Sequence, residues 1–169
     1  MPNGNVLLIA WEVKSASEMI QHGYDGNSSK YPTHIVEVQQ DGTGGEIVWE
    51  WHIWDHFIQD FDASKDNYGV IADHPELMDI NCGTAGSNGG PGGQANGDWM
   101  HVNAVDYNSD LDQIVLSSRL QSEIYIIDHS TTTEEAASHI GGNSGKGGDI
   151  LYRWGNPENY NRGDSSDKI

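Results

Sequence analysis

Short runs of alternating apolar and polar residues, separated by glycine, asparagine and aspartate, recur along the chain. Three of these runs occur twice, in the same order. The matched pairs are residues 5–11 with 113–119, residues 35–38 with 124–127, and residues 45–51 with 148–154. Each run has the β-branched and aromatic composition of a strand and is bounded by turn residues. The pattern therefore predicts an all-β protein that contains an internal repeat.

The second copy has one additional strand, predicted over Trp99 to Tyr107, ahead of its first matched run. The turn Asn108-Ser109-Asp110-Leu111 joins this strand to the run that begins at Gln113. Four antiparallel strands in succession are typical of one β-propeller blade. We therefore predict a β-propeller fragment of about one and a half blades. Its parts are a first blade over 4–52 without an inner strand, a loop over 53–98, a second blade over 99–154 and a tail over 155–169.

The connections between these strands are long. Residues 53–98 include a predicted short helical stretch near Trp54–Asp62 and end in the glycine-rich run Gly83–Gly97, which has the composition of a flexible excursion. In the second unit, residues Ser130 to Thr133 are predicted to cap a short helix at Glu134–Ser138. Because a propeller closes with typically 4–8 blades, we expect this chain to be an internal piece of a longer protein.

Charge and cysteine content narrow the range of partners. The chain has 26 acidic and 8 basic residues and a net charge of −18, so it should repel nucleic acid and anionic membranes. Its one cysteine, Cys82, permits no internal disulfide and no Cys-x-x-Cys metal site. No apolar run approaches the ~20 residues that span a bilayer, and the start Met1-Pro2-Asn3-Gly4 has no signal-peptide pattern.

Three polar residues of the second unit are the candidate site. His101 and Asn103 are two apart on the predicted inner strand, so their side chains should share a face. Antiparallel pairing across the turn places Arg119 opposite or diagonal to His101. Arginine offers a planar fork for oxyanions and histidine can donate a proton, which together predict an anion-binding pocket. A structural role, with the arginine paired to an acid and the histidine hydrogen-bonded, is the alternative.

Several runs also resemble the aryl-sulfate sulfotransferase family. The similar segments are residues 2–8, 45–51, 98–103, 114–119 and 152–157. The specific part is the His101-x-Asn103 pair, followed by Arg119 at the end of the next strand. The resemblance implies a six-bladed propeller, periplasmic or secreted, that moves a sulfuryl group from an aryl sulfate to a phenolic acceptor. It also implies a sulfated-histidine intermediate, without a nucleotide donor or other cofactor.

By this resemblance, His101, Asn103 and Arg119 would bind the sulfuryl oxygens, and His101 would protonate the departing phenolate. The nucleophilic histidine is expected beyond Ile169, so residues 1–169 alone should be inactive. The alternative function is a non-catalytic propeller module that binds a ligand or a protein.

His52, Asp55 and His56 follow the last strand of the first unit, with His74 further on. Two histidines at i and i+4 suit zinc if the stretch is helical, but the sequence lacks the His-Glu-x-x-His pattern and an identified third ligand. We therefore predict a surface loop and no metal site. Within that loop, His52 and His56 are candidate contacts for the aryl group.

Overall fold

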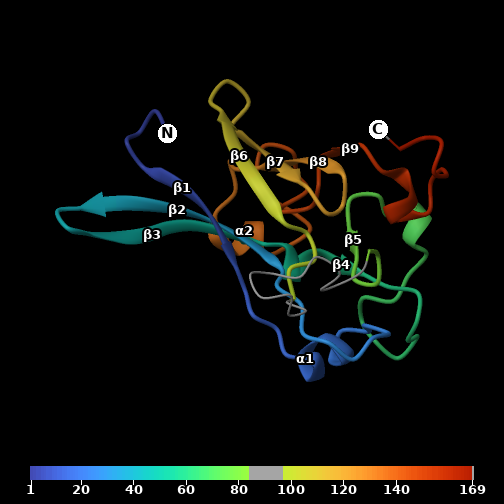
Figure 1. Ribbon diagram of the computed structural model, residues 1–169. Coiled ribbons are helices and arrows are strands. Elements are labelled where there is room, and N and C mark those ends of the chain that lie inside the picture. Colours follow the sequence, from blue (N-terminus) through green and yellow to red (C-terminus); the bar gives the residue numbers. More distant parts are fainter. Residues whose placement is uncertain (84–96, 169) are drawn as a thin grey trace.

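The computed structural model describes residues 1–83 and 97–168. Two antiparallel sheets share one apolar core, and a two-stranded parallel sheet and short helices lie at their margins (Figure 1). The predicted glycine-rich excursion, apart from Gly83 and Gly97, lies outside the described residues. None of the helices in the described part of the chain has the length and apolar character that a bilayer crossing requires.

The first sheet consists of β1 (Val6–Trp11), β2 (Thr33–Asp41) and β3 (Gly44–His52), hydrogen-bonded in that order. Between β1 and β2 lies α1 (Ala16–Gln21), which begins at a capping box formed by Ser15 and Glu18. The β2–β3 hairpin extends beyond the rest of the molecule (Figure 1). Its outer part, residues 39–48, is exposed.

The second sheet consists of β6 (Val102–Asn108), β7 (Gln113–Ser118), β8 (Glu123–Asp128) and β9 (Tyr152–Trp154), again in sequence order. The predicted three-stranded and four-stranded antiparallel units are therefore confirmed. The predicted short helix is also present, as α2 (Thr133–Ala136), with Thr132 as its N-cap.

The connection between the sheets contains the turns η1 (Ile53–His56) and η2 (Ile71–Asp73), and η3 (Pro157–Tyr160) follows β9. The helical stretch predicted near Trp54–Asp62 is wrong beyond one 3-10 turn. The chain instead enters β4 (Phe57–Ile58), which is buried and pairs in parallel with β5 (Met78–Asp79). Burial of these strands against the core outweighs the local helical tendency.

The strand register reproduces the sequence repeat. Residues that correspond in the two copies occupy corresponding cross-strand positions: Ile9, Ile35 and Trp51 in the first sheet, and Ser117, Ile124 and Trp154 in the second. The two last strands differ, because β9 forms over only three of the seven matched residues. Before it, the carbonyl of Gly148 accepts a hydrogen bond from Trp51 Nε1 at 2.7 Å, and Ile150 N donates to Glu76 O at 3.0 Å. These tertiary contacts replace strand pairing there.

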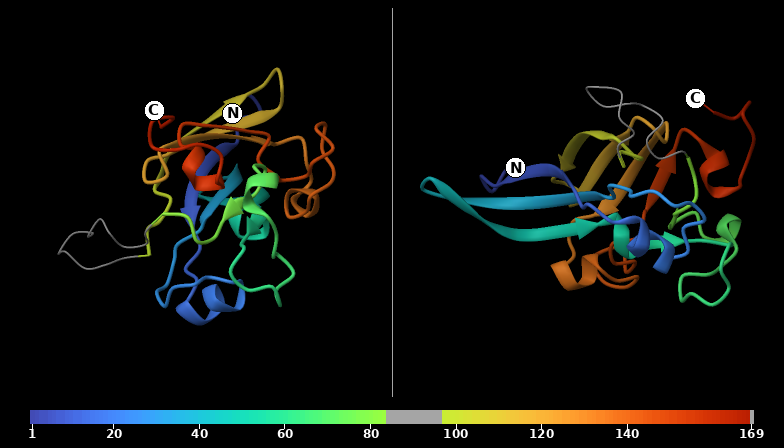
Figure 2. Two further views of the ribbon diagram at one scale, coloured as in Figure 1. Left: turned by 90° about the vertical axis from the view of Figure 1, so that its right-hand side faces the viewer. Right: turned by 60° about the horizontal axis from the view of Figure 1, so that its bottom comes forward.

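The two sheets lie against each other (Figure 2), and the shared core joins one face of each. From the first sheet it takes Ile35, Trp49 and Trp51, and from the second it takes Ile114, Leu116, Tyr125 and Ile127. The indole nitrogens are satisfied inside it, since Trp49 Nε1 donates to Thr131 Oγ1 at 3.2 Å. Large aromatic rings thus supply much of the apolar area that holds the sheets together.

A buried ion pair fastens β9 to β8. Arg153 Nε lies 2.8 Å from Glu123 Oε1, and Nη2 lies 2.7 Å from Oε2, a bidentate arrangement. Both side chains are almost fully buried. Arg153 also donates to the carbonyl of Leu77 at 3.1 Å, so the pair ties the inter-sheet loop to the second sheet. Burial by itself lowers the pKa of Arg153, but the hydrogen bonds to Glu123 outweigh it and raise that pKa.

We predict that Arg153→Met lowers the free energy of unfolding by about 3–5 kcal/mol, because it leaves the Glu123 carboxylate buried without its cation. The double variant Glu123→Gln/Arg153→Met should lose less than the single variant, since no buried charge remains. Urea unfolding followed by circular dichroism measures both. A double variant at least as unstable as Arg153→Met would contradict this account of the pair.

Candidate functional site

The backbone before β6 is anchored by two bulky buried residues. Trp99 Nε1 donates to the carbonyl of Cys82 at 2.5 Å, and the carbonyl of Met100 accepts from Ser118 Oγ at 2.6 Å. Both side chains are buried in the common core. Residue 101 therefore leaves the core at a fixed place, at the start of the strand.

His101 is oriented by Asp98. The Asp98 carboxylate accepts the His101 backbone N–H at 3.1 Å and makes a short contact with His101 Nδ1. The histidine has φ +49°, a left-handed conformation that is uncommon for a residue other than glycine. With Nδ1–H directed at a carboxylate, Nε2 is the nitrogen that remains for a ligand, and its role is set by the Asp98 contact.

Asn103 lies in a β-bulge. Val102 pairs with Ser118 and Ala104 pairs with Ser117, so Asn103 is the extra residue between them, and it is exposed. A bulge and the left-handed His101 interrupt strand alternation. The expectation that His101 and Asn103 share a face by alternation therefore does not apply to this backbone.

Arg119 lies beside His101 in the backbone pairing, as the turn position predicts. Arg119 N donates to His101 O at 3.1 Å, just beyond the end of β7. The side chain of Arg119 is exposed and makes no hydrogen bond or ion pair with the residues that the structure describes. It borders a cavity of about 300 Å³ that is also lined by Ser117, Ser122 and Trp154. His101 and Asn103 are not among the residues that line this cavity.

The arrangement suits recognition of an oxyanion. A guanidinium without a carboxylate partner among the described residues can form two parallel hydrogen bonds to such a ligand. The neighbouring His101 can donate or accept a proton through Nε2, with Asp98 holding the ring. Asp98 was not predicted from the sequence as a functional residue. Its position three residues before His101 is the signal that could have indicated this role.

His52 and His56 belong to different environments. His52 ends β3 and has its ring stacked on His34, with centroids 3.9 Å apart. His56 is fully buried in η1, where its Nδ1 lies 2.9 Å from Asp149 Oδ1 and its Nε2 lies 2.8 Å from the carbonyl of Ala136. The i, i+4 helical pair considered for zinc does not form, because the strand continues through His52.

A larger cavity, of about 640 Å³, lies beneath the loop that follows β4. It is lined partly by Trp54, Phe57, Tyr68 and His139, and by none of His101, Asn103 or Arg119. Size alone would favour this cavity, whereas the oriented histidine and the exposed arginine favour the edge of the second sheet. We place the candidate site at that edge because it combines a cation with a positioned proton donor.

The lone cysteine is not a candidate nucleophile. Cys82 is buried, and burial together with the charge of Asp79 raises the pKa of its thiol to about 12. A thiol with so high a pKa is almost entirely protonated at neutral pH, so it supplies no thiolate.

Comparison with known proteins points to one family. A family model described as Arylsulfotransferase (ASST) matches residues 1–141. This range contains His101, Asn103 and Arg119. No curated protein and no solved structure matches the chain.

The Asp98 contact predicts the tautomer of His101. In its neutral form, His101 should carry its proton on Nδ1. The ¹⁵N chemical shifts of the ring report this directly. Asp98→Ala should remove the preference, whereas Asp106→Ala, on the exposed part of β6, should leave it unchanged. A wild-type ring protonated on Nε2 would contradict this orientation of His101.

Proposed function

The chain belongs to the arylsulfotransferase family, and on this premise we propose that it forms part of an enzyme that transfers a sulfuryl group from an aryl sulfate to a phenolic acceptor. The observation that carries the proposal is the exposed Arg119 beside a histidine held by Asp98, within the family match. The substrates that the family implies are small aromatic molecules, which suits a site built from one cation and one proton donor.

We further propose that the two sheets are consecutive blades of a propeller. The way they stack supports this. Each sheet contributes a different face to the core, so the core residues of one sheet do not correspond in the repeat to the core residues of the other. The first sheet contributes the face of Ile9, Ile35 and Trp51. The second contributes Leu116, Tyr125 and Arg153, which correspond to Leu8, Val36 and Glu50. Such head-to-tail stacking can repeat, and it closes into a ring when the rotation allows.

The outward faces support the same proposal. Leu8 is 46% exposed on the free face of the first sheet, and Trp154 is 48% exposed on the free face of the second. Their counterparts, Leu116 and Trp51, are fully buried between the sheets. Further blades on both sides would cover Leu8 and Trp154 in the same manner, as a six-bladed ring requires.

In the proposed first half-reaction, a histidine outside residues 1–169 attacks the sulfur of the aryl sulfate. The bond between sulfur and the aryl oxygen breaks, and the electron pair leaves with that oxygen. Arg119 and Asn103 hold the sulfuryl oxygens, where negative charge accumulates. His101, as the imidazolium supported by Asp98, gives its Nε2 proton to the departing phenolate.

In the second half-reaction the roles reverse. Neutral His101 accepts the proton of the phenolic acceptor, whose oxygen attacks the sulfur. The bond between sulfur and the nucleophilic histidine breaks, and that histidine is restored. Asp98 touches neither substrate in this scheme and acts as a positioning residue for His101.

Two further features are also proposals. Contact of the aryl group with His52 and His56 stays a prediction, and of the two rings only that of His52 is partly exposed. An exported location, periplasmic or secreted, rests on the family resemblance alone.

The proposal predicts nucleotide-independent transfer in the whole protein, measured with a nitrophenyl sulfate donor and a phenol acceptor. Removal of a proton donor typically costs about 10²–10⁴ in rate, and removal of one oxyanion contact costs about 10²–10³. We expect losses in these ranges for His101→Ala and Arg119→Ala respectively. Asp98→Asn should lower kcat more than it changes KM, because it acts through His101.

The matched control is Arg162→Ala, which removes an exposed arginine near η3 and should leave turnover unchanged. Unchanged turnover in folded Arg119→Ala would contradict the assignment of the pocket. A folded wild-type protein without transfer over a broad panel of donors would instead favour the non-catalytic binding module.

A further inference from the structure

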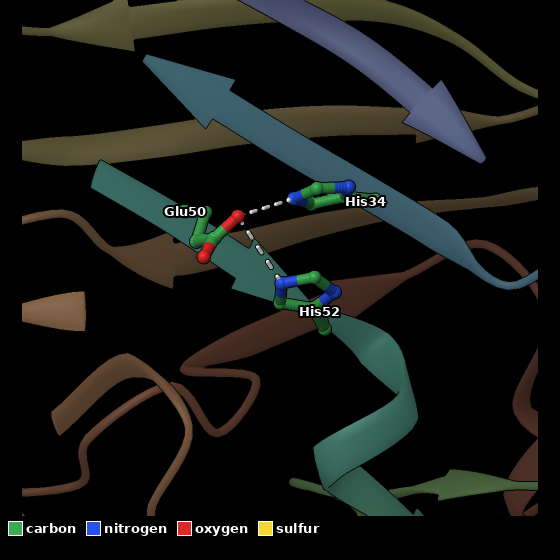
Figure 3. Close-up of side chains that lie close together, drawn as sticks. All are labelled: His34, Glu50 and His52. Atoms are coloured by element: carbon green, nitrogen blue, oxygen red, sulfur yellow. Dashed lines mark hydrogen bonds and ion pairs between the residues drawn. The ribbon is translucent and has the colours of Figure 1, made fainter. Parts of the chain in front are cut away.

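Three side chains of types that can ligate a metal converge on the face of the first sheet that points away from the shared core (Figure 3). His34 on β2 and His52 on β3 are direct cross-strand partners. Glu50 lies two residues before His52 and therefore on the same face. Regular strand pairing thus holds all three side chains on a rigid platform. The proposed sulfuryl transfer uses neither His34 nor Glu50, and it gives His52 only a contact with the aryl group.

The distances between their polar atoms suit one shared cation. His34 Nε2 lies 3.1 Å from Glu50 Oε2, and His52 Nε2 lies 3.5 Å from the same oxygen. The three ligand atoms all lie within 4.8 Å of one another. In a tetrahedral zinc site with ligands at about 2.0–2.1 Å, neighbouring ligands are roughly 3.3 Å apart. The two rings are stacked, with centroids 3.9 Å and planes 19° apart, so both rings must rotate before their nitrogens can face one ion.

A fourth residue, Glu12, contacts the ring nitrogen of His52 that does not face Glu50. Glu12 Oε2 lies 3.2 Å from His52 Nδ1, the nitrogen opposite the one that faces Glu50. This oxygen is buried and accepts no well-formed hydrogen bond from the described residues. Carboxylates commonly hold metal-ligating histidines in this way, by accepting the N–H of the other ring nitrogen. The Nε2 lone pair of His52 would then face the oxygen of Glu50, and a cation between them removes the repulsion.

The positions of the second sheet that correspond to His34 and Glu50 provide a comparison. His34 corresponds to Glu123 in the repeat, and Glu50 corresponds to Arg153. In the second sheet these positions form the buried ion pair, with the guanidinium as the cation. In the first sheet the same positions carry an imidazole and a carboxylate, with a second imidazole from His52. The first sheet therefore carries no guanidinium at the place where the second sheet has Arg153.

We propose that His34, Glu50 and His52 bind a divalent first-row transition ion, for which Zn²⁺ is the best match, and that Glu12 orients His52. Two imidazoles and one carboxylate form a recurrent zinc ligand set, which leaves one position for water. Magnesium and calcium prefer sets made of oxygen ligands, so they should not compete.

A second group, His56, His139 and Asp149, is also compact but fits worse. Asp149 Oδ1 lies 2.9 Å from His56 Nδ1 and 2.7 Å from His139 Nδ1, and the other ring nitrogen of His56 already contacts the carbonyl of Ala136 at 2.8 Å. His139 is the exposed member and provides a control that tests the location of any bound ion.

The test is isothermal titration of Zn²⁺ into the purified protein, treated with a chelator and carrying no histidine tag. We expect one equivalent to bind, with little effect of excess Mg²⁺. Glu50→Gln and His34→Ala/His52→Ala should weaken binding at least about 100-fold. Glu12→Gln should weaken it about 10–100-fold, the usual effect of losing such a supporting carboxylate. His139→Ala should bind as the wild type does.

Co²⁺ substitution provides a second readout, because visible absorption bands should appear in the wild type and disappear in Glu50→Gln. Circular dichroism verifies folding, and the near-isosteric Glu50→Gln and Glu12→Gln keep the test valid if the double alanine variant unfolds. Absence of stoichiometric zinc binding would overturn the proposal. So would wild-type affinity in Glu50→Gln, or loss of binding in His139→Ala, which would move the ion to the other group.

Discussion

The burial of aromatic side chains between two sheets is the constraint on which the rest of this structure depends. Trp49 and Trp51 of β3 pack with residues of β7 and β8 in one continuous core, and both indole nitrogens find partners beyond the second sheet's strands. These two rings reach from the first sheet into the core that both sheets share, so they help to fix how the sheets face each other. The positions of the loops depend on these rings, because the Thr131 hydroxyl and the Gly148 carbonyl accept the hydrogen bonds of the two buried indoles.

Corresponding positions in the two sheets carry different chemistry on the same backbone geometry. Where the second sheet has Glu123 and Arg153, buried and satisfied by each other, the first has His34 and Glu50 together with His52. In a buried pair of opposite charges each group compensates the other, so the pair needs no added ion. Two imidazoles and a carboxylate lack the guanidinium of that pair, and this difference is the basis for proposing a metal there.

The geometry of the candidate site depends both on strand pairing and on the local backbone conformation. The backbone pairing of Arg119 with His101 follows from the turn at 108–111 and was predictable from the chain. The bulge at Asn103, the left-handed φ of His101 and the Asp98 contact were not predictable, because each depends on the anchoring of Trp99 and Met100 in the core. The role of Asp98 became visible once that anchor placed its carboxylate against the ring.

By itself, the sequence determined the order of the strands in the two antiparallel sheets, the capped helix at Thr132 and the three-plus-four division of these sheets. These features arise from alternation, turn residues and caps, which act over a few neighbours along the chain. Only the tertiary structure decided that His52 joins His34 while His56 turns inward to Asp149, and that β9 shortens beside Gly148. Such choices depend on contacts between residues about 20 to 100 positions apart, whose free energies no local pattern encodes.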